Sequence, residues 1–204
     1  MRSTSSLLRA GVLIPVAVAS VFCLAAPANA ATVNVNWNCR AAGIATTTLA
    51  ASITTTAPST AASGSAVAIT LAPSASTVPT TVSGITVNHI KNQTITFAAP
   101  TNSTLVSASV SGGTVPGTVS TSGGNVVLSM PGQINAGTTF TPPAVTINVT
   151  AGAAGTPIVS KYAGTSYTNP GMKQTTNISL LGNRDVASTC YANPSPTLTT
   201  TTVS

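Results

Sequence analysis

The chain of 204 residues contains one acidic side chain, Asp185, and one histidine, His89, and its formal net charge is +6. Active sites that transfer protons or hold metal ions are built from Asp, Glu, His and Cys, so this composition leaves little from which to assemble one. We therefore expect a protein that is not an enzyme and that holds no metal ion or cofactor.

The N-terminus has the pattern of a secretory signal peptide. Arg2 and Arg9 form a positive start, an apolar run covers residues 11–26, and Ala28-Asn29-Ala30 places small residues at a cleavage site. We predict that residues 1–30 are removed and that the protein is secreted to the extracellular space or the cell envelope.

Two other interpretations of this segment are weaker. A retained membrane anchor needs about twenty apolar residues, and Pro15 interrupts the run. A lipoprotein signal would modify Cys23, but the bulky Phe22 precedes it, where a small residue is usual. No later apolar run is long enough for a transmembrane helix, so we expect none in the mature chain.

Two cysteines follow the predicted cleavage site, near opposite ends of the mature chain. Exported proteins enter an oxidising space, where two such cysteines most simply pair with each other. We predict a Cys39–Cys190 disulfide, with the first and last strands side by side, and free thiols are the alternative. The chain-entropy estimate for so long a loop is about 5 kcal/mol.

Alternating apolar and polar residues predict β-strands along the mature chain. The run 32–38 places Val33, Val35 and Trp37 on one face and polar residues on the other, which is the period of a half-buried strand. Similar runs follow near residues 49–53, 66–72, 85–87, 95–97, 106–110, 126–130, 145–149 and 178–180.

Turn signals separate these runs, at 122–125, 131–132, 142–143 and 169–171. Short strands with such turns indicate an antiparallel β-sandwich or barrel, and we predict a sandwich over residues 31–192. The segment 54–65 and a Pro/Thr-rich tail, 193–204, look like loops. The tail could instead form a final edge strand over 198–203.

Aromatic residues are few, so we consider for each one whether it packs in the core or lies on a binding surface. Trp37 alternates with apolar residues and is predicted to lie in the core, with sugar stacking as the alternative. Tyr162 and Tyr167, beside Lys161 in a polar, turn-rich stretch, are predicted at the rim, where loops often carry recognition. We take these three residues as a candidate ligand or partner surface, although the tyrosines could merely pack the loop. Tyr191 is also expected at the rim.

Catalytic constellations are not supported. Paired carboxylates cannot form from Asp185 alone. The chain contains the residue types of a Ser-His-Asp catalytic triad, in His89, Asp185 and many serines. It has no Gly-x-Ser-x-Gly motif, which would place the serine as a nucleophile. His89 alternates with strand residues and is predicted to be an ordinary strand histidine.

The mature chain has five cations and one acid. The cations are Arg40, Lys91, Lys161, Lys173 and Arg184. They are scattered rather than clustered with aromatics, so we expect no nucleic-acid binding. Attraction to anionic wall polymers or lipid headgroups is compatible with this charge and would weaken with salt.

Several motifs together resemble small secreted all-β proteins of actinobacteria. They are Trp37-Asn38-Cys39 at the start, Met130-Pro131-Gly132 and the stretch 137–143 in the middle, and Cys190 before a Pro/Thr tail. The resemblance implies an exported immunoglobulin-like sandwich at or beyond the cell envelope, and it brings no catalytic residues.

These features favour a non-enzymatic surface module that binds a cell-wall glycan, an envelope lipid or a protein partner. A self-assembling structural or fibre protein is the second hypothesis, because Thr/Val strands with few charges have weakly protected edges. A third is an envelope β-barrel pore, since residues 43–56 are long enough for a tilted spanning strand.

Overall fold

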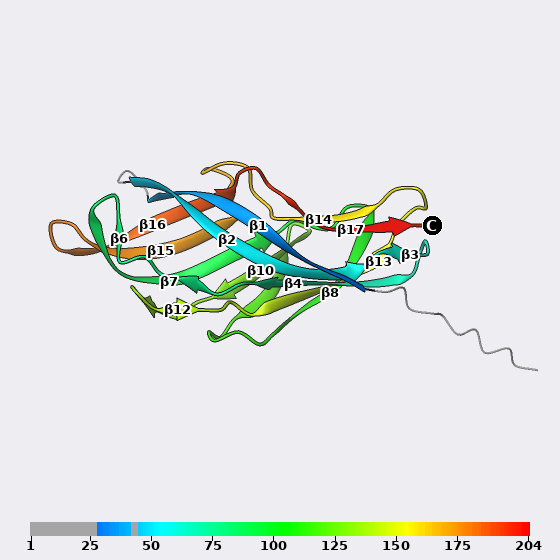
Figure 1. Ribbon diagram of the computed structural model, residues 1–204, viewed down its shortest axis with the longest axis horizontal. Coiled ribbons are helices and arrows are strands. Elements are labelled where there is room, and N and C mark those ends of the chain that lie inside the picture. Colours follow the sequence, from blue (N-terminus) through cyan, green and yellow to red (C-terminus); the bar gives the residue numbers. More distant parts are fainter. Residues whose placement is uncertain (1–27, 42–44) are drawn as a thin grey trace, which may run out of the picture.

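The computed structural model describes residues 28–41 and 45–204, and this part of the chain is elongated and built of β-strands (Figure 1). Among these residues, no helix has the length and apolar character needed to cross a membrane. Most of the predicted signal peptide, residues 1–27, lies outside the described part. Residues 28–30 begin the first strand and are exposed, so cleavage after Ala30 would remove no buried side chain from it.

Two long strands, β1 (Ala28–Ala41) and β2 (Ala45–Pro58), pair antiparallel over their whole length. The other strands of four or more residues are β4 (Ala66–Pro73), β7 (Ile85–Phe97), β8 (Ser103–Ser111), β9 (Thr118–Ser122), β10 (Asn125–Met130), β13 (Ala144–Ala151), β14 (Ile158–Lys161), β15 (Met172–Ser179), β16 (Asn183–Ala192) and β17 (Thr197–Val203). Two-residue strands are β3 (Thr60–Ala61), β5 (Ser76–Thr77), β6 (Thr81–Val82), β11 (Ile134–Asn135) and β12 (Thr139–Phe140).

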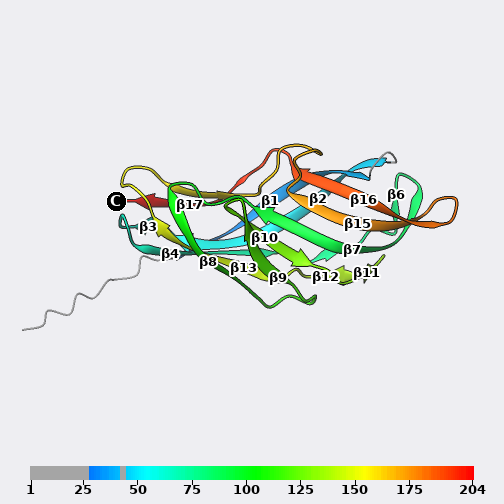
Figure 2. The same ribbon diagram turned by 180° about the vertical axis from the view of Figure 1, so that it is seen from behind.

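Most of these strands belong to one curled sheet. Its order is β8-β13-β4-β2-β1-β16-β15-β7-β10-β9, with β6 and β11 also paired to β7. The sheet bends so far that its end strands, β8 and β9, come close to each other. β1 and β2 lie toward the viewer in Figure 1, and β7 and β10 lie toward the viewer in the opposite view of Figure 2.

The predicted antiparallel all-β fold is therefore confirmed. The immunoglobulin-like form of the sandwich is not confirmed, because the main strands follow one continuous hydrogen-bonded path rather than two separate sheets. Two smaller sheets complete the fold, β14-β17-β3 and β12-β5.

The curled sheet encloses a core made by alternating residues. Ile69 and Ile147, from β4 and β13, belong to the same buried cluster as Phe97 and Leu128, from β7 and β10. A second cluster fills the end of the molecule formed by β6, β7 and the β15–β16 hairpin, and it includes Val87, Ile178 and Val186. β-Branched side chains suit such strands because they pack well on a pleated surface.

The predicted disulfide is confirmed. Cys39 on β1 and Cys190 on β16 are direct cross-strand partners and form a bond with an S–S distance of 2.04 Å. Both sulfurs belong to buried residues on the inner side of the sheet. The first strand and a strand close to the C-terminus thus lie side by side, as the cysteine positions predicted.

Most of the two segments predicted as loops is strand instead, which corrects the predicted end of the domain and confirms the alternative of a final strand over 198–203. β2 continues to Pro58, and residues 197–203 form β17, which pairs antiparallel with β14 and parallel with β3. Threonine hydroxyls are satisfied inside the fold: Oγ1 of Thr201 donates to the carbonyl of Pro58 at 2.6 Å. Leu198 and Val203 are buried. Residues 197–203 are therefore part of the domain and supply the central strand of the small sheet β14-β17-β3.

Candidate functional site

The outer face of β1, β16 and β15 gathers cationic, aromatic and amide side chains. Successive side chains of a strand point to opposite faces of the sheet. Cys39, Cys190 and Met172 point into the core, so their neighbours along each strand point outward. We call the resulting surface the outer patch. Its strand members are Asn38, Arg40, Lys173, Thr189 and Tyr191, and Tyr167 joins them from the loop between β14 and β15 by contacting Arg40 and Tyr191.

Two cations of the outer patch lie on the same cross-strand row. Arg40 pairs with Thr189, and Thr189 pairs with Lys173. Adjacent strands are about 4.8 Å apart, so the backbones of Arg40 and Lys173 are about 10 Å apart. Both residues are exposed, and a single anionic chain lying across the strands could contact both.

Two half-buried tyrosines adjoin Arg40. The Arg40 guanidinium carbon lies 4.6 Å from the ring centroid of Tyr167, which is a cation–π geometry. The rings of Tyr167 and Tyr191 meet edge to face, with centroids 5.1 Å apart. Nδ2 of Asn38 donates to the Tyr191 hydroxyl at 3.4 Å. These contacts hold the guanidinium and both rings in one arrangement.

The loop between β14 and β15 carries Tyr167, and two glycines fix its base. The Gly171 amide donates to the Cys190 carbonyl at 2.9 Å, and the Thr96 amide donates to the Gly171 carbonyl at 2.8 Å. A Cβ at Gly171 would overlap the Ala163 carbonyl oxygen. A Cβ at Gly164, where φ is +85°, would overlap the Gly171 backbone. The loop thus lies against the sheet at a distance that only glycine allows.

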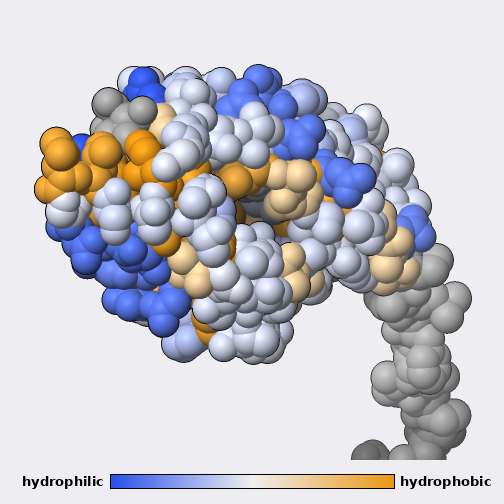
Figure 3. All heavy atoms as spheres, turned by 60° about the vertical axis from the view of Figure 1, so that its left-hand side comes forward, coloured by the Kyte–Doolittle hydropathy of each residue, from blue (hydrophilic) through white to orange (hydrophobic). Residues whose placement is uncertain are grey.

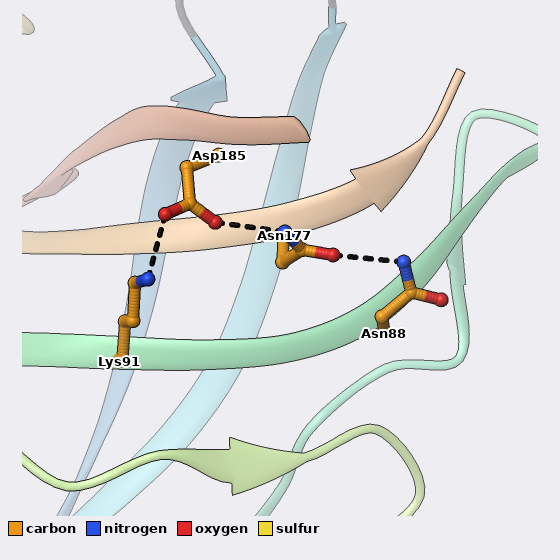
Figure 4. Close-up of polar contacts among 4 residues, drawn as sticks. All are labelled: Asn88, Lys91, Asn177 and Asp185. Carbon is orange, nitrogen blue, oxygen red and sulfur yellow. Dashed lines mark hydrogen bonds and ion pairs between the residues drawn. The ribbon is translucent and has the colours of Figure 1, made fainter. Parts of the chain in front are cut away.

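A second polar group lies on the outer side of β7, β15 and β16 (Figure 4). Nζ of Lys91 lies 2.6 Å from Oδ2 of Asp185, and Nδ2 of Asn177 donates to Oδ1 of Asp185 at 2.8 Å. Asn88 continues the network by donating to Oδ1 of Asn177. Hydrogen bonds from Asn177 and Lys91 hold the pKa of the Asp185 carboxyl below its usual value.

This ion pair leaves the cations of the outer patch without a carboxylate side chain. Asp185 is the one acidic side chain in the sequence, and its carboxylate is engaged with Lys91. Arg40 and Lys173 therefore keep a local excess of positive charge, which attracts anions.

The structure separates the three residues that the sequence grouped as a candidate surface. Tyr167 lies in the outer patch, while Lys161 is exposed at the end of β14. Tyr162 is buried, with 6% of its surface exposed, so its predicted rim position is wrong. Its ring stacks on Phe97 and meets Trp37 edge to face, with centroids 5.1 and 4.7 Å away. Burial also raises the pKa of Tyr162.

Trp37 is buried, as its core interpretation predicted. His89 lies in β7 opposite Asn135 and Asn177, at an ordinary strand position. In the part of the chain that the structure describes, no three His, Cys, Asp or Glu residues group as a metal site would require.

Three main members of the outer patch are absent from the candidate surface predicted from the sequence: Arg40, Lys173 and Tyr191, of which only Tyr191 was expected at the rim. A signal for two of them was present, because a Cys39–Cys190 bond between neighbouring strands places their outward-facing neighbours side by side. Lys173 could not be placed, since the pairing of β15 with β16 depends on the turn between them.

Comparisons with known proteins do not assign a family. No protein-family model matches the chain, and no curated protein matches it. Among solved structures, it is similar to a protein of Corynebacterium diphtheriae provisionally described as membrane anchored, with a TM-score of 0.48 and 17% identity. The match covers 86% of this chain and 38% of that protein. At these values the likeness supports no inference about membrane attachment or function.

Proposed function

We propose that this protein is an exported, non-enzymatic binding module of the cell envelope, and that the outer patch contacts an anionic, hydroxyl-rich polymer of the wall. The observation that carries the proposal is the row Arg40–Thr189–Lys173 beside two tyrosines, with no carboxylate side chain available to neutralise the two cations.

Each component of the outer patch suits such a polymer. Arginine and lysine attract phosphate or carboxylate groups, and arginine can bind them through two parallel hydrogen bonds. Tyrosine offers an apolar ring and a hydroxyl, which match the apolar and hydroxyl faces of a sugar. Threonine and asparagine add donors and acceptors. Arg40 is also held in place by Tyr167, which reduces the entropy lost on binding.

A sedimentation experiment tests this proposal. The protein is mixed with isolated cell walls, with walls stripped of their phosphate- and carboxylate-bearing polymers, and with neutral lipid vesicles. We expect saturable binding to intact walls, weaker binding as salt rises, and little binding to the other two. Equal binding to intact and stripped walls, or binding only to vesicles, would contradict the proposal.

Self-assembly is a second candidate, and the edge of β2 favours it. Among the described residues, the Ala45–Ala51 part of β2 pairs with β1, while β4 pairs with β2 only at Ile53–Thr56. An unpaired edge can add a strand from another chain. Thr46→Lys with Thr48→Lys would block such pairing. Assemblies that form at high protein concentration and disappear with this variant would support self-assembly, and monomers throughout would exclude it.

A further inference from the structure

Two adjoining cavities lie on the inner side of the curled sheet, away from the outer patch. One has a volume of about 90 Å³ and is lined by residues that include Trp37, Ile95, Phe140 and Met172. The other has a volume of about 70 Å³ and is lined by residues that include Val87, Ile178 and Ser188. Leu49, Pro79, Ile90 and Gln174 line both. We call the two together the inner cavity.

The inner cavity opens at the end of the molecule that Figure 3 brings forward, where apolar residues gather and the surface is hollowed. Ala45 and Leu49 of β2 are only half-buried there. Val82 and Ile85, around the turn between β6 and β7, also line this part. The cavity is thus reachable from solvent through an apolar mouth.

A chain of polar side chains, buried except for the half-buried Gln174, crosses the lining and ends in an unpaired acceptor. Nε2 of Gln93 donates to Oε1 of Gln174 at 3.0 Å, and Gln174 donates in turn to Thr176. The Thr176 hydroxyl is 2.9 Å from that of Ser188. Gln93 is buried, with 7% of its surface exposed, and its Oε1 has no hydrogen-bond partner. A buried unpaired carbonyl is costly, so a donor is expected at this position.

No lining residue carries a formal charge at neutral pH. The lining contains neither carboxylates nor cationic side chains, and its one tyrosine, Tyr162, stays neutral because burial raises its pKa. A charged ligand would lose its hydration without gaining a partner. The inner cavity therefore suits an uncharged molecule.

We propose that the inner cavity binds a small, uncharged amphiphile whose apolar body lies among Trp37, Leu49 and Ile90 and whose hydroxyl or N–H group donates to Oε1 of Gln93. Each cavity exceeds several-fold the roughly 10–15 Å³ that one water needs, and apolar cavities readily bind small hydrocarbons. This site is separate from the outer patch, and it does not depend on the proposed wall binding.

A pair of matched probes tests the proposal with the purified protein. 1-Octanol carries a hydroxyl donor, whereas methyl heptyl ether has the same number of heavy atoms and no donor. Binding is followed by NMR, through the side-chain amide of Gln93 and the methyl group of Met172. We expect 1-octanol to bind saturably, about tenfold or more tightly than the ether, and to shift both signals.

Gln93→Met should remove this preference, and Gln133→Met, at an exposed position, should retain it. Equal affinities of the native protein for the two probes would overturn the proposal, even if Gln93→Met does not fold. So would the absence of saturable binding up to the solubility limit, in which case ordered water supplies the donor to Gln93.

Discussion

Cys39 and Cys190 face each other across β1 and β16, and their bond places Arg40 beside Thr189 on the opposite side of the sheet. One covalent link thus stabilises the core and fixes the pairing on which the outer patch depends. Replacing both cysteines by alanine should lower the free energy of unfolding by about 2–5 kcal/mol. Urea unfolding of the oxidised native protein and the variant measures this, and equal midpoints would show that the bond adds no stability.

Tyr162 and Tyr167 lie five positions apart but differ in burial, and we expect different roles for them. Tyr162→Ala would remove a buried ring from between Trp37 and Phe97, and should cost about 3–5 kcal/mol of stability. Tyr167→Ala should change stability by less than about 1 kcal/mol and weaken binding to walls. Thermal unfolding and wall sedimentation of both variants separate the roles. A Tyr167→Ala variant that unfolds as readily as Tyr162→Ala would be inconsistent with them.

Gly164 and Gly155 form a matched pair for testing the loop that carries Tyr167. Both have positive φ, +85° and +81°, but only a Cβ at Gly164 would meet backbone. Gly155→Ala should cost about 1 kcal/mol for its backbone conformation alone. Gly164→Ala should cost about 1–3 kcal/mol more, because the loop must move away from Gly171. Equal losses in chemical unfolding would mean that the loop does not need this close approach.

Asp185 should titrate below its ordinary range, because Asn177 and Lys91 favour its charged form. With its folded-state pKa lowered, its contribution to stability is present above the unfolded-state pKa and is lost as the pH falls through the folded-state value. Asn177→Ala should raise the pKa of Asp185, whereas Asn148→Ala, whose amide contacts Ser107, should not. NMR titration of the Asp185 carboxyl carbon measures this pKa directly. An unchanged pKa in Asn177→Ala would show that the hydrogen bond from Asn177 does not lower it.

Local patterns in the sequence predict much of the fold. Alternation around Trp37 and Ile147 gives strands and their buried faces, and two cysteines give the pairing of β1 with β16. The loop predictions for 54–65 and 193–204 are mostly wrong, and the alternative of a strand over 198–203 is correct, because threonine suits both loops and strands. Only the partners of its hydroxyl, such as Pro58 for Thr201, distinguish the two.

The candidate sites depend on long-range pairing, which local patterns do not specify. Tyr162 and Tyr167 share one polar stretch, yet a backbone bridge from Tyr162 to Phe97 draws the first into the core. Gln93 lies beside Gln174 only because β7 pairs with β15. Such neighbours are set by the curl of the whole sheet.

Wall binding by two charge-matched variants tests the central claim most directly. Arg40→Ala with Lys173→Ala removes both cations of the outer patch, and Lys161→Ala with Arg184→Ala removes two exposed cations elsewhere. We predict that the first variant binds isolated walls about tenfold or more weakly than the native protein, with a shallower salt dependence. The second should bind within about twofold of the native protein. Equal losses in both variants would show that net charge, rather than the outer patch, holds the protein on the wall.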